Sequence, residues 1–299
     1  MLIPRRTLLG GFAGLSLTSR ATWALPSVRH GPALPPLIKT SCNLYSFNEP
    51  LRSRATTLEE VFEYCADVGF EAVDPTGYYF TGYPVPPPDE EISRIRKRAF
   101  LLGLEISGTG VRNDFTLAVR AARESEVAHV ARWVDVAARL GAPVLRVFAG
   151  LRVPDGHTRE EATGWVVECL QACTRQGAAR GVLIVLQNHH DVFKTAGEIL
   201  EVHRRVGSDW LGLNVDIGSL RTTADPYAEI ATLAPHAYTW QIKENVYRND
   251  KEEPTDLDAI VRILRESRYR GYVPLETLGA GDPKIKVRQL FERFVDAAG

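Results

Sequence analysis

Residues 181–191 read GVLIVLQNHHD, and this stretch decides the class of fold. Five apolar residues follow a glycine, which is enough for one strand buried on both faces, as in a parallel sheet. The polar run QNHHD comes directly afterwards, and such groups are costly to bury without partners. We therefore expect a central parallel strand whose carboxyl end opens into a polar site.

A short apolar run followed by an amphipathic helical stretch repeats on both sides of this segment. Glycines that end several helical stretches suit left-handed C-caps leading into the next strand. The predicted strands are residues 37–42, 72–74, 104–107, 144–148, 182–187, 211–216, 238–242 and 272–276. The predicted helices are residues 57–68, 89–102, 124–140, 158–179, 195–206, 226–233, 255–266 and 284–297.

Eight alternations of this kind predict an α/β fold, a single (β/α)8 TIM barrel over residues 37–299. A doubly wound open sheet is the alternative. It usually carries a glycine-rich phosphate loop after its first strand, and residues 43–47 contain no glycine. In a barrel the active site lies at the carboxyl ends of the strands, so polar residues there become the candidates.

The first residues are typical of an export signal. Arg5 and Arg6 precede a small and apolar run over residues 8–17, which is too short to span a bilayer. Adjacent arginines predict a bacterial twin-arginine signal over residues 1–24 and a linker over residues 25–36, with an ordinary secretory signal or a frayed N-terminus as alternatives. We expect a periplasmic or exported protein without stable membrane insertion.

The composition describes a globular chain and argues against a nucleic-acid partner. The 299 residues are 44% hydrophobic, and 36 Lys and Arg face 37 Asp and Glu, which leaves no positive excess for a polyanion. Removing residues 1–24 takes away three arginines and no acidic residue, so the net charge changes from −1 to −4. This balance suits a neutral small-molecule substrate.

The four cysteines do not follow a metal-binding or redox pattern. Cys169 and Cys173 lie one turn apart on the apolar stripe of a predicted helix, where two thiols do not easily reach disulfide geometry. We expect small core residues.

Polar side chains lie at the carboxyl ends of the strands in the second half of the predicted barrel. Alternate residues of a strand share a face, so residues two apart point into the mouth together. The inward residues are Gln187 with His189, Asn214 with Asp216, Gln241 with Lys243, and Glu276.

These strand ends resemble the metal-site segments of the sugar phosphate isomerase/epimerase family, the xylose isomerase-like barrels. The segments are residues 186–189 (LQNH), 215–219 (VDIGS), 240–244 (WQIKE) and 274–276 (PLE), and the likeness extends to residues 68–74 and 140–143. In that family they supply Glu, Asp, His and Glu to one divalent metal ion, commonly Mn or Mg. The resemblance implies Gln187, Asp216, Gln241 and Glu276 as the metal ligands of this chain.

The two glutamines depart from the family pattern. Two carboxylates and two amide oxygens still neutralise a divalent cation and suit Mg, Mn or Ca better than zinc. We expect weaker binding than with the family's full set. The alternative is a mouth without metal, in which the amides only form hydrogen bonds.

The departure also changes the expected proton transfer. Epimerases of the family use carboxylates at the positions of Gln187 and Glu276, and an amide cannot act as a base. Glu276 remains as the base that removes a proton next to a carbonyl, while the metal and Lys243 stabilise the enediolate. His189 or Glu244 is left as the acid. The alternatives are a ligand-orienting role for His189 and a rim ion pair between Lys243 and Glu244.

Other residues expected near the mouth have structural alternatives as well. Arg146 either binds an anionic or hydroxylated substrate group or forms a salt bridge inside the barrel. Asp74 either reaches the mouth or caps a turn. Aromatic residues of the early loops suit stacking on a sugar, loop packing or a subunit contact in a homo-oligomer. They are Tyr45, Phe47, Tyr78, Tyr79, Phe80 and Tyr83.

The leading hypothesis is an exported, metal-dependent isomerase or epimerase that acts on a carbohydrate, a keto-sugar or keto-glycoside, by abstraction of a proton alpha to a carbonyl. A β-eliminating lyase acting on an oxidised glycoside uses the same base and is one alternative. A noncatalytic sugar-binding barrel is the other, favoured by the loss of a base at Gln187.

Overall fold

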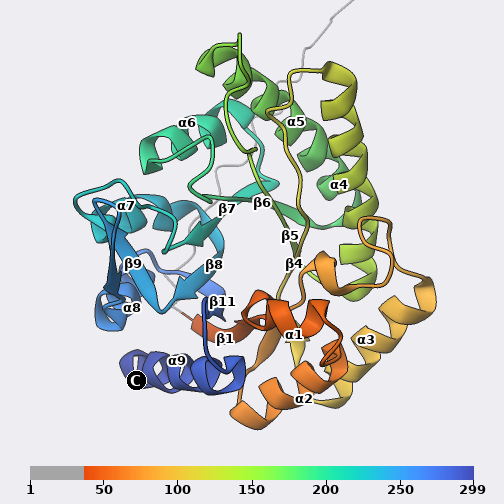
Figure 1. The fold of residues 1–299 in the computed structure, drawn as a ribbon, viewed down its shortest axis with the longest axis vertical. Coiled ribbons are helices and arrows are strands. Elements are labelled where there is room, and N and C mark those ends of the chain that lie inside the picture. The colour runs from red at the N-terminus through yellow and green to blue at the C-terminus, as the bar shows by residue number, and fades with distance from the viewer. Residues whose placement is uncertain (1–36) are drawn as a thin grey trace, which may run out of the picture. The chain divides into compact units, whose positions relative to one another are not determined.

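The structure, a computed structural model, describes residues 37–299. The predicted signal and linker, residues 1–36, lie outside the described residues. Within residues 37–299 the strands form one nearly closed parallel barrel with helices around it (Figure 1). The predicted α/β barrel is confirmed.

The barrel strands pair in the order β3-β2-β1-β11-β8-β7-β6-β5-β4, and every neighbouring pair is parallel. These strands are β1 (Leu37–Asn43), β2 (Ala72–Asp74), β3 (Glu105–Ile106), β4 (Thr109–Gly110), β5 (Val144–Val147), β6 (Leu183–Gln187), β7 (Leu211–Asp216), β8 (Ala237–Lys243) and β11 (Arg270–Glu276). The first and last strands of the barrel, β1 and β11, lie side by side with Leu37 opposite Arg270 and Cys42 opposite Leu275.

The third position of the barrel is divided between two short strands. β3 pairs with β2, and β4 pairs with β5, so residues 105–110 connect the two ends of the sheet order. We predicted only its first half, because residues 107–110 read SGTG and lack the apolar character of a strand. The glycines serve close packing here, since a Cβ on Gly108 or Gly110 would lie 2.8 Å from a side chain of β5.

Helices follow the strands as the sequence predicts, and local capping explains their ends. α5 begins after Thr158, whose hydroxyl accepts from the backbone N–H of Glu161 in a capping box, and ends at Gly181 with φ 69°, which leads into β6. Thr57 and Thr195 form the same box at α2 and α6. The helices are α1 (Asn48–Arg52), α2 (Leu58–Val68), α3 (Asp89–Leu101), α4 (Arg120–Leu140), α5 (Arg159–Arg180), α6 (Ala196–Val206), α7 (Pro226–Leu233), α8 (Leu257–Glu266) and α9 (Pro283–Ala298).

A small hairpin after β8 was not predicted. β9 (Asn245–Arg248) pairs antiparallel with β10 (Lys251–Pro254). Its turn residues Asn249 and Asp250 have φ of 50° and 61°, which Asn and Asp tolerate better than most residues.

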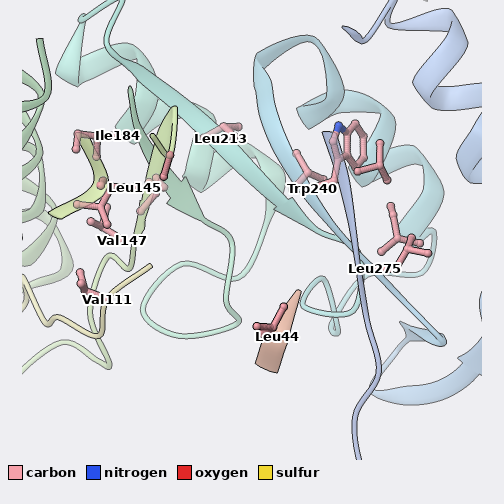
Figure 2. Packing of buried hydrophobic residues seen from close by; sticks show 14 of the residues in the cluster. Leu44, Val111, Leu145, Val147, Ile184, Leu213, Trp240 and Leu275 are labelled. Carbon is pink, nitrogen blue, oxygen red and sulfur yellow. The ribbon is translucent and has the colours of Figure 1, made fainter. Parts of the chain in front are cut away.

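The core lies between the barrel and its helices. Successive residues of a strand point to opposite faces, so one set packs in this core and the other points toward the site. Leu145 and Val147 of β5 pack in this core, as do Leu213 and Trp240 (Figure 2). The residues between and beside them therefore point to the barrel interior. All four cysteines are buried free thiols, as predicted. In the part of the chain that the structure describes, no helix is long and apolar enough to cross a membrane.

Candidate active site

A cavity of about 1140 Å³ opens at the carboxyl ends of the barrel strands. Gln187, His189, Gln241, Lys243 and Glu276 line it together, as alternation along the strands predicts. Its volume is slightly above the range of ordinary small-molecule pockets, roughly 300–1,000 Å³. The cavity is therefore large enough for a carbohydrate.

The floor of the cavity comes from four strands that are neighbours in the sheet: β6, β7, β8 and β11. Asp216 lies opposite Gln241 in the register of β7 and β8, and Glu276 lies opposite Lys243 in that of β11 and β8. This register brings residues far apart in the sequence into one layer.

Asp216 is the centre of the floor and is fully buried, with 0% exposure. Its Oδ2 accepts from Gln187 Nε2 at 2.8 Å and from Ser219 Oγ at 2.9 Å, and Lys243 Nζ lies 2.9 Å from the same oxygen. The backbone N–H of Gly218 donates to Oδ1 at 3.0 Å. Every one of these donors stabilises the ionised carboxylate.

Lys243 places its ammonium between two carboxylates. Nζ is 2.9 Å from Asp216 Oδ2 and 3.7 Å from Glu276 Oε2. Burial opposes the charge of Lys243, but Asp216 and Glu276 outweigh it and raise its pKa above the usual value. Burial likewise opposes the charge of Asp216, and Lys243 reverses this effect and lowers the pKa of that carboxyl. The pair is charged at neutral pH.

Glu276 differs from Asp216 in its environment. It is 4% exposed, and its Oε2 is buried without a hydrogen-bond partner in the described chain. Burial raises the pKa of Glu276 to about 7, and Lys243 opposes this rise. A carboxylate with few hydrogen bonds and a pKa near neutrality is suited to accept a proton.

His189 follows β6 and borders the cavity with its ring 4.6 Å, between centroids, from that of Phe148. The cavity walls desolvate the ring and lower its pKa below the usual value, although Asp216 opposes the shift and the residue keeps exposed area in the mouth. The imidazole is neutral at pH 7. A neutral ring can form hydrogen bonds with substrate hydroxyls, and it suits that role better than the predicted role as an acid.

The structure places Glu244 away from this group. Its carboxylate is 3.1 Å from Lys286 Nζ and accepts from the backbone N–H of Leu278 at 3.3 Å. Glu244 is not among the residues that line the cavity, and it pairs with Lys286 rather than with its neighbour Lys243. We therefore assign it no part in the chemistry.

Asn188, directly after β6, braces the site. Its side chain donates to the backbone carbonyl of Asp216 and accepts from the backbone N–H of Asp216, both at 2.8 Å. These two bonds hold the end of β7 beside β6 and thereby position the Asp216 carboxylate. The expected bracing role of Asn188 agrees with this geometry.

Aromatic side chains of the early loops form one wall of the cavity. Tyr45, Tyr78, Tyr79 and Tyr83 all line it. Tyr78 contacts Tyr45 and Tyr83 edge-on, with ring centroids 6.4 Å and 5.2 Å away. The predicted aromatic surface over a polar mouth is present.

Sequence reasoning missed several residues of the site. Ser219 donates to Asp216, and the signal was available in the Asp-Ile-Gly-Ser run that ends β7. Arg112 and Arg221 also line the cavity. Arg112 follows β4, a strand that was not predicted, so its place at the mouth could not be inferred.

The four residues implied as metal ligands meet, but their arrangement does not fit a divalent ion. Asp216 Oδ2 is surrounded by three donors, and Gln241 Oε1 accepts from Gln187 Nε2 at 2.6 Å. A dication beside Asp216 and Glu276 would also stand against the Lys243 ammonium, a like charge in a buried site. Within residues 37–299, no group of three or more His, Cys, Asp and Glu side chains is arranged to hold a metal. We derive no chemistry from a metal ion.

A family model described as the xylose isomerase-like TIM barrel matches residues 62–295. The chain belongs to this family. The matched region includes every floor residue of the cavity. A comparison with curated protein sequences found no match.

Solved structures share the fold. A D-psicose 3-epimerase crystallised in the presence of D-fructose has a TM-score of 0.73 at 18% identity, covering 87% of this chain and 100% of that chain. A 3-keto-D-glucoside 4-epimerase from E. coli has a TM-score of 0.69 at 14% identity, covering 87% and 98%. A xylose isomerase-like TIM barrel protein from Mycobacterium smegmatis in complex with magnesium has a TM-score of 0.64 at 17% identity, covering 89% and 98%. Neighbours of this fold therefore include metal-bound proteins.

Proposed function

We propose that this barrel is a carbohydrate-modifying enzyme of the isomerase or epimerase type, which removes a proton from a carbon next to a carbonyl group. One observation carries the proposal: the ammonium of Lys243, whose side chain is only 13% exposed, lies 3.7 Å from a buried carboxylate, Glu276, on the floor of a cavity of sufficient size for a sugar. Family membership and the sugar epimerases among the structural neighbours support it.

Glu276 acts as the base in this proposal. It takes the proton, and the electrons of the C–H bond form the C=C bond of an enediolate. Lys243 donates a hydrogen bond to the oxygen on which negative charge develops, and its own charge favours the enediolate over the ketone. Asp216 keeps Lys243 protonated and in place, because its Oδ2 lies 2.9 Å from Nζ.

The second face of the substrate has no carboxylate equivalent to Glu276. Gln187 Nε2 donates to Asp216 and to Gln241, and an amide does not exchange a proton as a base. Return of the proton by Glu276 to the adjacent carbon uses the same base, while the hydroxyl proton of the enediolate passes to the neighbouring oxygen so that the new carbonyl forms. The arrangement thus favours isomerisation, because inversion at one carbon requires a further proton donor on the opposite face.

The family resemblance predicts metal dependence, and the proposal made here leaves it out. The relatives with bound ions support it, while the donors around Asp216 and the position of Lys243 speak against it in this chain. Export through a twin-arginine signal is part of the proposal, and N-terminal sequencing of the protein from a periplasmic extract tests it.

Deuterium uptake from D2O tests the proposed function. Keto-sugars and 3-keto-glucosides are incubated with the protein in D2O and followed by proton NMR, and we expect loss of the signal of a hydrogen next to the carbonyl. Glu276→Gln should abolish this exchange, whereas the exposed control Glu124→Gln on α4 should retain it. Exchange that survives in Glu276→Gln contradicts the assignment of the base.

The same experiment separates the alternatives. A new vinyl signal identifies β-elimination from an oxidised glycoside. Sugar binding without exchange or product for any tested substrate supports a noncatalytic sugar-binding barrel and overturns the proposed function.

A further inference from the structure

We infer that the substrate carries an oxyanion, a carboxylate or a phosphate, and that Arg146 binds it. This inference rests on the proposed function, because it names the class of carbohydrate that the same cavity accepts. The net charge of the chain had suggested a neutral sugar, and the local distribution of charge leads to a different conclusion.

Arg146 is a buried cation with an unused hydrogen-bonding edge. It lies on β5 with 7% exposure and lines the cavity. Its Nη1 donates to the carbonyl of Val111 at 2.7 Å and to Tyr78 Oη at 3.2 Å. In residues 37–299, no hydrogen bond involves its Nε or Nη2, and no carboxylate lies within 4.0 Å of the guanidinium. Asp74 interacts with this charge only from beyond that distance. A buried charge without a counter-ion in direct contact is costly unless a ligand compensates it.

The neighbours of Arg146 hold its guanidinium in one orientation. The Cζ atom lies 4.3 Å from the ring centroid of Phe148. Gly110 approaches the guanidinium so closely that a Cβ there would lie 2.8 Å from Cζ, Nε and Nη2. The Nε–Nη2 edge is a planar fork that matches the two oxygens of a carboxylate or phosphate. Because the fork is already oriented, binding an oxyanion loses little side-chain entropy.

The rest of the mouth has the same sign of charge. Its lining cations are Arg52, Arg54, Arg112, Arg146, Arg221 and Lys243, and its lining carboxylates are Asp191 and Glu276. None of these five arginines forms an ion pair with a carboxylate of the described chain, whereas Arg94, Arg98 and Arg139 on the outer helices do. Even with Asp216 beneath the floor and Asp74 near Arg146 counted, the mouth has two more positive than negative charges, although the whole chain has a net charge of −1. Such a mouth attracts anions and concentrates them.

The charges also define two ends of a bound molecule. Lys243 and Glu276 face the reacting carbonyl, and Asp216 neutralises Lys243. Arg146 has no carboxylate in direct contact, since Asp74 acts on it from more than 4.0 Å, so its Nε–Nη2 edge remains available. An acidic sugar would place its oxyanion at Arg146 and its carbonyl at Lys243.

Calorimetric titration tests the inference with three related probes: methyl α-D-glucoside, D-glucuronate and D-glucose 6-phosphate. We expect at least one of the two anionic probes to bind about 10-fold or more tightly than the neutral glycoside, which corresponds to about 1.4 kcal/mol. The tighter of the two identifies carboxylate or phosphate as the oxyanion. The preference should decrease with added NaCl.

Two substitutions locate the effect. Arg146→Gln removes the charge, and Arg146→Lys keeps the charge but loses the fork; both should reduce the preference for the anionic probe by about 10-fold or more. The control Arg132→Gln removes one positive charge from an exposed position of α4 and should leave the preference unchanged. A circular dichroism spectrum of Arg146→Lys that matches the wild type confirms that the fold is intact.

Equal affinity for all three probes overturns the inference, as does a preference that persists in Arg146→Lys. Failure of both anionic probes to bind in the millimolar range overturns it as well. These outcomes concern binding only. If these outcomes overturn the inference on the oxyanion but a neutral keto-sugar still exchanges its hydrogen in D2O, the proposed function stands.

Discussion

Replacement of Lys243 by methionine tests the ion pair on the floor of the site, and the test needs no substrate. Lys243→Met removes the ammonium but keeps most of the side-chain volume, and it leaves Asp216 as an unpaired charge with 0% exposure. Loss of one partner of a buried ion pair costs about 3–5 kcal/mol. Asp216 retains hydrogen bonds from Gln187, Ser219 and Gly218, so we expect the lower end, about 3 kcal/mol.

Urea denaturation and thermal unfolding measure this loss. About 3 kcal/mol corresponds to a fall in Tm of roughly 6–12 °C in a domain of this size. The matched control is Lys286→Met. Its ion pair with Glu244 has a similar length, 3.1 Å, but its side chains are 19% and 27% exposed, so its loss should cost about 1 kcal/mol or less.

A double-mutant cycle shows whether the loss arises from the ion pair. In an Asp216→Asn background, Lys243→Met should cost at least about 1 kcal/mol less than in the wild type, because no buried charge is left unpaired. Equal costs in both backgrounds, or a cost of Lys243→Met no larger than that of Lys286→Met, would refute the account of the floor as a charge-paired network.

Three further predictions concern the wall, the interior and the metal. Gly110→Ala places a methyl group against Arg146. It should lower the free energy of unfolding by about 1–3 kcal/mol in urea denaturation and weaken binding of the acidic probe. Unchanged stability and binding would show that Arg146 is not confined. Burial raises the pKa of Asp74 from 3.8 to about 6, with Arg146 opposing, so the folded state binds this proton more tightly than the unfolded chain and stability falls as pH rises from about 4 to 6. Asp74→Asn should accordingly stabilise the protein by up to about 3 kcal/mol at pH 8 and by little at pH 4, and an equal effect at both values would contradict this. In thermal unfolding with MnCl2 the wild type should show no shift in Tm, whereas Gln187→Glu combined with Gln241→His, which restores the family's ligands, should gain one. Any shift in the wild type would contradict the fit described above.

Periodicity along the chain was sufficient to predict the barrel and the inward face of its strands. The alternation that places Leu145 and Val147 in the core also places Arg146 in the interior, and this follows from sequence alone. The strand predicted over residues 104–107 contains β3, but the short strand β4 was not predicted, because glycine, serine and threonine have no clear pattern there. Pairing with β2 and β5, rather than local preference, makes them strands.

The partners of the site residues could not be predicted in the same way. Lys243 was expected beside a metal, and its contact with Asp216 depends on the register of β7 and β8 and on side-chain reach. Glu244 is the neighbour of Lys243 in sequence, yet it pairs with Lys286 on α9. The excess of arginines at the mouth comes from segments that are distant in sequence, so net charge did not reveal it.

Deuterium exchange by the wild-type protein after exhaustive dialysis against EDTA tests the central claim most directly, since Lys243 and Glu276 are proposed to supply the chemistry. A keto-sugar that exchanges its hydrogen in D2O is compared before dialysis, after dialysis and after addition of MnCl2. We predict the same rate of exchange in all three samples and none in Glu276→Gln. Loss of exchange on dialysis and its return with Mn2+ would contradict the account.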